Sequence, residues 1–175
     1  PSPCPIVVKF DQYASGRTSF GFQPQGGRSY PVAWDMEVCG SRERILDAVL
    51  PHEITHAIFA THFGQPLPRW ADEGACTTVE HTSERAKHKQ MLVEFLMTKR
   101  GIPFNRMFRM TEYPRDILPL YAQGHSVARY LIQQGGKRKF VDFVGRGMDT
   151  SNWNAATEEF YGYRDLSELQ VDWVN

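Results

Sequence analysis

Two histidines share one helical stripe with apolar side chains, and this pattern limits the fold more than any other feature of the sequence. From Ser41 onward, apolar residues recur three or four positions apart, which is the spacing of one face of an α-helix. The stripe consists of Ile45, Val49, His52, His56, Phe59 and Phe63. It predicts a helix capped by Ser41 and stopped by Gly64 after about His62, with both histidines facing the interior. Because Pro51 removes one backbone hydrogen bond, a bend is expected just before His52.

The residues before this helix have strand character. Three β-branched or aromatic runs are separated by Gly, Ser and Pro, and they cover residues 6–10, 18–22 and 30–38. A small antiparallel or mixed sheet is therefore expected over residues 1–40, with a mainly helical part over residues 41–175. A chain of this length has room for one hydrophobic core, so the sequence predicts a single α+β domain over residues 1–175.

More helices are expected after residue 68. The first begins near Trp70 or Ala71, and one of its faces carries Glu73, Cys76, Thr77 and Glu80. The others cover residues 84–98, 121–134, 139–144, 153–160 and 166–174. Gly135 and Gly136 end the helix over residues 121–134, because glycine is the usual residue just past a helix C-terminus.

Charge and hydropathy exclude two classes of partner. The chain has 20 basic and 20 acidic side chains, which argues against the strongly basic surface of a nucleic-acid-binding protein. The short basic stretch 136–139 is interpreted as the solvated start of a helix. No apolar run approaches the roughly 20 residues that cross a bilayer, so no membrane span is expected.

The first residue and the cysteines bear on the compartment. The chain starts at Pro1 and not at Met, which suggests a processed protein or an excised domain and favours an extracytoplasmic or secreted location. Its cysteines, Cys4, Cys39 and Cys76, lack the spacings of zinc-ribbon or redox motifs. Two alternatives stay open, namely a Cys4–Cys39 disulfide or three reduced thiols with Cys76 buried in a helix.

The segment Leu50–His56 contains the arrangement His-Glu-x-x-His. Residues four apart on a helix project from adjacent turns on one face, so His52 and His56 can bind one metal ion. Zinc is the natural occupant, because neutral imidazole nitrogens bind it in a tetrahedral shell. Glu53 points beside the metal, where it can act as a general base toward an activated water. The sequence therefore predicts one zinc ion per chain.

A catalytic zinc site needs a third protein ligand, and the spacing alone leaves that ligand open. The candidates are the nearby carboxylates and the remaining histidines, namely Asp72, Glu73, Glu80, His62, His81, His88 and His125.

The stretch Pro68–Gly74 resembles the Trp-x-x-Glu-Gly segment of the gluzincins, a family of zinc peptidases. The resemblance implies that Glu73 is the third ligand, with Asp72 beside it as the competing carboxylate. Glu80 matches a carboxylate that hydrogen-bonds a zinc-bound histidine in some gluzincins. The segment Tyr121–Gly124 resembles their Tyr-x-x-Gly segment, which implies that the Tyr121 hydroxyl stabilises the oxyanion.

The resemblance covers about residues 41–135, and the whole chain is similar to compact peptidase-MA-like domains of bacterial proteins. It implies a zincin-like fold and hydrolysis of peptide or protein substrates. Gluzincin aminopeptidases bind the substrate's free amine with a Gly-x-Met-Glu-Asn strand, whereas this chain has Trp34–Glu37, which favours an endopeptidase. The alternatives are a catalytically silent zinc module that binds a peptide or protein, and a hydrolase of a non-peptide amide or a cell-wall cross-link.

The remaining aromatic and histidine residues have less specific interpretations. Trp34 and Met36 precede the active helix, where they serve either strand addition of a peptide or, as the preferred interpretation, ordinary sheet packing. His125 is interpreted as structural, with substrate contact as the alternative. His62, His81 and His88 receive no role, and core packing or loop anchoring accounts for Phe104, Phe108 and Tyr113.

Overall fold

A computed structural model describes residues 4–175, so the first three residues of the expected sheet-rich part lie outside the described residues. The chain forms two compact units. Among the described residues, unit 1 comprises residues 4–67 and 79–85, and unit 2 comprises residues 68–78 and 86–175. The architecture is α+β, as predicted. None of the helices in the described range has the length and apolar character of a membrane-spanning segment.

Unit 1 contains a mixed sheet of the strands β1 (Ile6–Phe10), β2 (Ser15–Gln25) and β3 (Arg28–Gly40). The order is β1-β3-β2, with β3 parallel to β1 and antiparallel to β2. Gly26 and Gly27 both have positive φ, which suits the tight two-residue turn between β2 and β3. β1 pairs with β3 only over Met36–Gly40, so it covers the β3 edge at Met36, while Trp34 lies outside this pairing.

The helix that carries His52 and His56 begins as predicted but contains an irregular turn. It consists of α1 (Arg42–Arg44), the π-helical segment η1 (Ile45–Val49) and α2 (Leu50–Phe63). In η1 the Leu50 N–H donates to the Ile45 carbonyl, five residues back. The wider turn falls immediately before Pro51, whose ring would clash with the carbonyl four residues earlier in a regular helix. The proline therefore produces a π-turn where the sequence predicted a bend.

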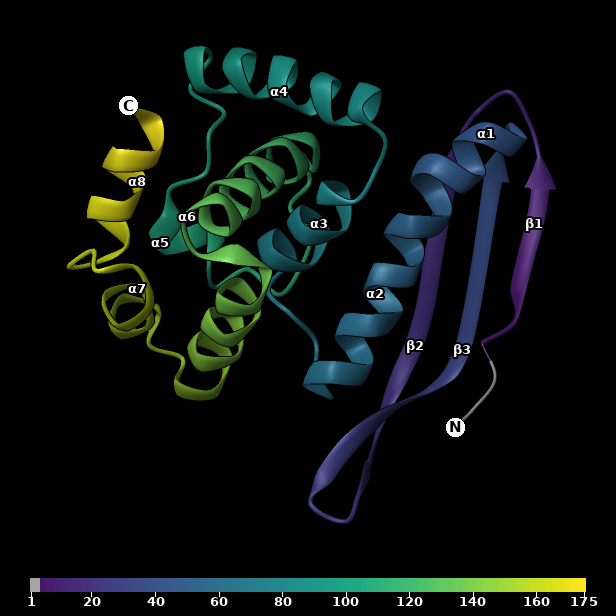
Figure 1. Ribbon diagram of the computed structural model, residues 1–175, viewed down its shortest axis with the longest axis horizontal. Coiled ribbons are helices and arrows are strands. Elements are labelled where there is room, and N and C mark those ends of the chain that lie inside the picture. Colours follow the sequence, from purple (N-terminus) through teal and green to yellow (C-terminus); the bar gives the residue numbers. More distant parts are fainter. Residues whose placement is uncertain (1–3) are drawn as a thin grey trace. The chain divides into compact units, whose positions relative to one another are not determined.

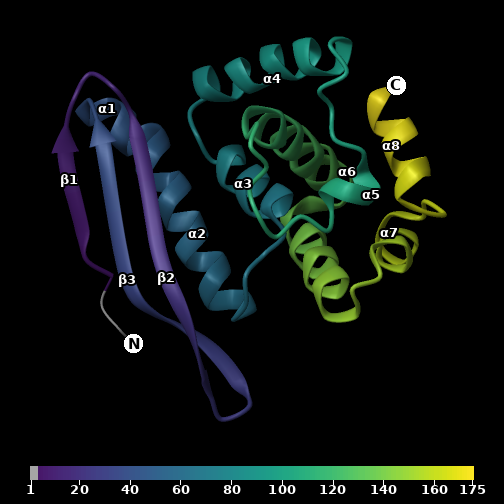
Figure 2. The ribbon, with the colours of Figure 1, turned by 180° about the vertical axis from the view of Figure 1, so that it is seen from behind.

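Both ends of this helix are capped in the predicted manner. The Ser41 Oγ accepts a hydrogen bond of 3.3 Å from the Arg44 N–H, and Gly64 ends α2 with a φ of +64°. Figures 1 and 2 show α2 running along one face of the sheet. On that face Met36 and Val38 from β3 pack with Ile45 in a buried cluster. This packing fixes which side of α2 faces the sheet.

The structure decides between the two alternatives for the N-terminal cysteines. Cys4 and Cys39 are free thiols. The parallel register places Cys39 beside Lys9, five residues along the chain from Cys4. At about 3.3 Å per strand residue, Cys4 and Cys39 are roughly 16 Å apart, beyond the reach of a disulfide.

Unit 2 is helical. Its elements are α3 (Arg69–Thr78), residues 86–97 of α4 (Thr82–Met97), α5 (Phe104–Met107), α6 (Leu118–Thr150), α7 (Trp153–Tyr161) and α8 (Leu166–Val174). Gly136 has a φ of +78° and a non-helical ψ, so α6 is two helical stretches, which Figure 2 shows with different axes. The predicted break is confirmed, but the second stretch continues to Thr150 instead of ending near residue 144. The short helix α5 lies between the predicted helices over residues 84–98 and 121–134, where the sequence predicted no helix.

Two glycines bring α3 and α6 into close contact inside unit 2. A Cβ on Gly74 would overlap the carbonyl oxygen of Gly124, and a Cβ on Gly124 would lie 2.8 Å from the Trp70 carbonyl oxygen. The Trp70 ring is fully buried and stacks on Phe108 at a centroid distance of 4.1 Å. Core packing therefore accounts for Trp70, Gly74 and Gly124. The polar residues of the same two segments are the ones available for a functional site.

Candidate metal centre

Helix α2 presents His52 and His56 as a pair. Their ring centroids are 4.9 Å apart with the planes inclined at 68°, and both side chains are partly buried. The i and i+4 spacing on successive turns of α2 produces this proximity. Two imidazoles at this separation can supply two of the four ligands of a tetrahedral zinc site.

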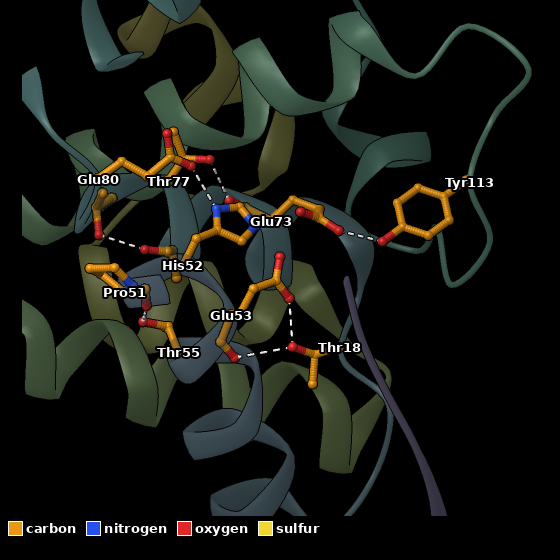
Figure 3. Close-up of polar contacts among 11 residues, drawn as sticks. Thr18, Pro51, His52, Glu53, Thr55, Glu73, Thr77, Glu80 and Tyr113 are labelled. Atoms are coloured by element: carbon orange, nitrogen blue, oxygen red, sulfur yellow. Dashed lines mark hydrogen bonds and ion pairs between the residues drawn. The ribbon is translucent and has the colours of Figure 1, made fainter. Parts of the chain in front are cut away.

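Glu80 fixes the orientation of the first histidine. Its Oε1 lies 2.6 Å from Nδ1 of His52, and both side chains are largely buried. Figure 3 draws this contact as a dashed line. A carboxylate only accepts hydrogen bonds, so the His52 Nδ1 carries a proton, and in the neutral imidazole Nε2 then has the lone pair that a metal can bind. The sequence placed Glu80 on the same helix face as Glu73, and this placement is wrong, because α3 ends at Thr78. Glu80 instead lies in the turn that follows, within unit 1.

Glu53, the residue after His52 on α2, faces strand β2. Its side chain is only 5% exposed, and its Oε2 accepts a hydrogen bond of 2.5 Å from the Thr18 hydroxyl on β2. A Cβ on Gly16, two residues earlier on β2, would overlap the Glu53 carboxylate. The general base predicted from the sequence is therefore held against a strand that precedes it by 35 residues.

In unit 2, α3 presents Glu73 next to a tyrosine. Glu73 is 2% exposed, and its Oε1 accepts a hydrogen bond from the Tyr113 hydroxyl, drawn in Figure 3. The neighbouring Asp72 contacts the Arg69 guanidinium at 3.5 Å. The Arg69 guanidinium also lies 4.3 Å above the Tyr113 ring. Asp72 thus has a cationic partner in its own unit, while Glu73 has a phenolic donor.

Tyr121 lies beside this pair on α6. Its ring is nearly parallel to that of Tyr113, with centroids 6.5 Å apart. Burial, followed by the negative charge of Glu73 and the neighbouring Tyr113, raises the pKa of Tyr121 well above its usual value near 10. Burial and the Glu73 charge raise the pKa of Tyr113 in the same way. Both phenols are therefore protonated hydrogen-bond donors throughout the physiological pH range.

The predicted site residues fall into two groups. Unit 1 brings together four of them, namely His52, Glu53, His56 and Glu80. Unit 2 brings together Glu73 and Tyr121. The sequence did not identify Thr18, because no local pattern links a strand residue to a helix far along the chain. For Tyr113 the sequence predicts only core packing or loop anchoring, and its hydrogen bond to Glu73 is an additional finding.

The other histidines stay outside both groups. His81 Nδ1 accepts the backbone N–H of Ser83 in the first turn of α4, which is a capping role. The rings of His88 and His125 lie 5.9 Å apart inside unit 2, and His125 is buried. The His62 ring contacts Phe63 at the exposed end of α2.

Glu37 is the last residue of the segment Trp34–Glu37, which the sequence analysis compares with the amine-binding strand of the aminopeptidases. Its carboxylate is held in another contact. It forms an ion pair of 2.7 Å with Lys9, and this contact lowers the pKa of the Glu37 carboxyl. Its neighbours Met36 and Val38 point toward α2, so alternation along β3 turns Glu37 to the opposite face of the sheet.

No protein-family model matches the chain, and neither the curated proteins nor the solved structures contain a significant match.

Proposed function

We propose that this protein is a zinc-dependent endopeptidase with a zincin-like fold. In this proposal His52, His56 and Glu73 hold one zinc ion, Glu53 is the general base, Glu80 orients His52 and Tyr121 stabilises the oxyanion. The observation that carries the proposal is the Glu80 carboxylate 2.6 Å from His52 Nδ1, with the His56 ring one turn away on α2.

The donor groups in unit 1 suit zinc in their chemistry. Metal-binding histidines usually donate their second ring nitrogen to a carboxylate, which fixes the tautomer and increases the basicity of the ligand nitrogen. Glu80 supplies that carboxylate for His52. A carboxylate third ligand such as Glu73 completes a two-histidine, one-glutamate set, which is a known catalytic zinc shell. When bound, zinc lowers the pKa of a water ligand toward about 7 and polarises the substrate carbonyl.

Glu53 carries the proton in the proposed reaction. It takes one proton from the attacking water while the water oxygen forms a bond to the carbonyl carbon. It then passes that proton to the amide nitrogen as the carbon–nitrogen bond breaks, which leaves a carboxylic acid and an amine. Its near-complete burial and its bond to Thr18 support this role, because they restrict the carboxylate to one position.

Tyr121 is proposed to donate a hydrogen bond to the negative oxygen that develops on the carbonyl. The raised pKa of its hydroxyl supports this role, because the phenol keeps its proton at every pH at which the enzyme would work. The ion pair of Glu37 with Lys9 supports an endopeptidase, because it leaves this carboxylate a poor candidate for capturing a free substrate amine.

Substitution of the general base tests the proposal. Glu53→Gln should abolish cleavage of an unstructured quenched peptide library while the zinc content stays at the wild-type level. Glu43→Gln, which changes an exposed glutamate on α1, is the matched control and should leave both unchanged. Wild-type zinc binding without cleavage would favour a silent binding module. Cleavage of a cell-wall cross-link or another non-peptide amide in place of the peptides would change the substrate class but not the roles of the residues.

The third ligand is tested separately. Cys76 lies one turn after Glu73 on α3, is fully buried and carries a thiol, which is also a zinc ligand. Glu73→Ala should lower zinc content and Cys76→Ala should not. The reverse result would assign the third position to the cysteine.

A further inference from the structure

We infer that Thr18 is a positioning residue, which holds Glu53 in place for proton transfer, and that Gly16 provides the space that this arrangement needs. The inference rests on the proposed peptidase function and adds to it two residues of β2. All the groups that carry it belong to unit 1.

The register of the sheet places Gly16 and Thr18 on the face that α2 covers. Thr18 is paired with Met36 and Gly16 with Val38, and the two β3 side chains are buried under α2. Paired residues of neighbouring strands point to the same face, so positions 16 and 18 face α2 as well. Glu53 is the residue of α2 that meets them.

The Thr18 hydroxyl selects one carboxylate oxygen of Glu53. It donates to Oε2 at 2.5 Å, a short bond of the kind that a charged acceptor forms. Because the Thr18 hydroxyl contacts Oε2, Oε1 is the oxygen without this bond, and we assign the proton transfer from water to it. The β-branched Thr18 side chain has few rotamers, so its hydroxyl holds the carboxylate at little cost in conformational entropy.

Because Gly16 has no side chain, it leaves space beside Oε1 of Glu53. A Cβ at this position would overlap Glu53 Oε1 and also approach the carbon atoms Cδ and Cγ, the latter two at 2.8 Å. The Gly16 φ is not positive, so backbone conformation does not require glycine here. The requirement is the space beside the carboxylate, and any larger residue must push Glu53 away from Thr18.

The decisive experiment compares Thr18→Val with Thr18→Ser. Valine keeps the shape and removes the hydroxyl, so kcat should fall about 10- to 100-fold, the effect of a misplaced catalytic group, while KM and zinc content stay constant. Serine restores the hydroxyl and should recover most of kcat. Thr61→Val is the matched control, because the Thr61 hydroxyl bonds the Ala57 carbonyl on the same helix and should not affect turnover.

A second measurement reports the contact without any turnover. In protein labelled with 13C at the glutamate carboxyl, the Glu53 resonance is identified by its loss in Glu53→Gln. It should shift in Thr18→Val and in Gly16→Ala, and stay in place in Thr61→Val.

Each result has a separate meaning. If the wild type cleaves no substrate, both the peptidase proposal and the positioning role are wrong. If the wild type cleaves peptides but Thr18→Val keeps its kcat or its Glu53 resonance, only the positioning role is overturned.

Discussion

Glu80 Oε1 lies 2.6 Å from Nδ1 of His52, although 28 residues separate them in the chain. The chain passes through α3, a helix of unit 2, between these two residues and then returns to unit 1. A carboxylate on the second ring nitrogen is a usual feature of metal-binding histidines, so this contact supports the proposed ligand role of His52.

Removal of this carboxylate should weaken metal binding. In Glu80→Ala the His52 ring loses the acceptor that fixes its tautomer, so zinc affinity should fall about 10- to 100-fold. Competition with a fluorescent chelator measures the change. Glu84→Ala is the control, because Glu84 pairs with Arg44 in the same unit and should leave affinity unchanged. Equal affinities for the wild type and Glu80→Ala would remove the orienting role.

The two tyrosines near Glu73 should differ in their effect on catalysis. Tyr121→Phe removes the proposed oxyanion donor, so kcat should fall about 100-fold or more with KM nearly constant. Tyr113→Phe removes the hydroxyl that bonds Glu73 Oε1 and should act mainly on zinc content. Steady-state kinetics and elemental analysis of both variants separate these effects. A loss of kcat confined to Tyr113→Phe would transfer the oxyanion role to Tyr113.

Contact between α3 and α6 should be sensitive to one methyl group. In Gly74→Ala the added Cβ meets the Gly124 carbonyl oxygen, a backbone atom that cannot move aside, so the free energy of unfolding should fall by about 1 to 3 kcal/mol. Urea denaturation measures it. Gly21→Ala is the control, since a Cβ there has no neighbour within 4 Å. Unchanged stability in Gly74→Ala would show that the two helices are not packed this closely.

The sequence predicts the local features of this structure and misses the long-range contacts. The predicted bounds of α8 agree with the structure, because Asp165 and the apolar spacing that follows it are local signals. The four-residue spacing of His52 and His56 on α2 is also a local signal. The position of Glu80 and the contacts of Thr18 and Tyr113 depend on pairings across 28 to 40 residues, which no local pattern encodes.

A cluster of two tyrosines and one aspartate should make the stability of unit 2 depend on pH. Asp172 accepts hydrogen bonds from the hydroxyls of Tyr130 and Tyr163, and these bonds lower its pKa below the ordinary value of 3.8. The stabilisation is therefore complete above pH 3.8 and disappears as the pH falls through the lowered pKa. The pKa of Tyr130 is raised, first by burial and then by Asp172, so stability also falls as the pH rises above 10.

Asp172→Asn tests this dependence. Urea denaturation at pH 7 should show a variant less stable than the wild type, and the difference should shrink at a pH below 3. Asp149→Asn, at an exposed position on α6, should match the wild type at both values. A difference that is the same at pH 7 and at low pH would contradict the proposed linkage.

Zinc binding by His52 and His56 is the basis of the proposed function. The direct test is elemental analysis of the purified wild type and of His52→Ala, combined with cleavage of a quenched unstructured peptide library. We expect one zinc ion per wild-type chain, with both zinc and cleavage lost in the variant. A wild-type protein without metal, or a variant that still cleaves peptides, would contradict the proposed function.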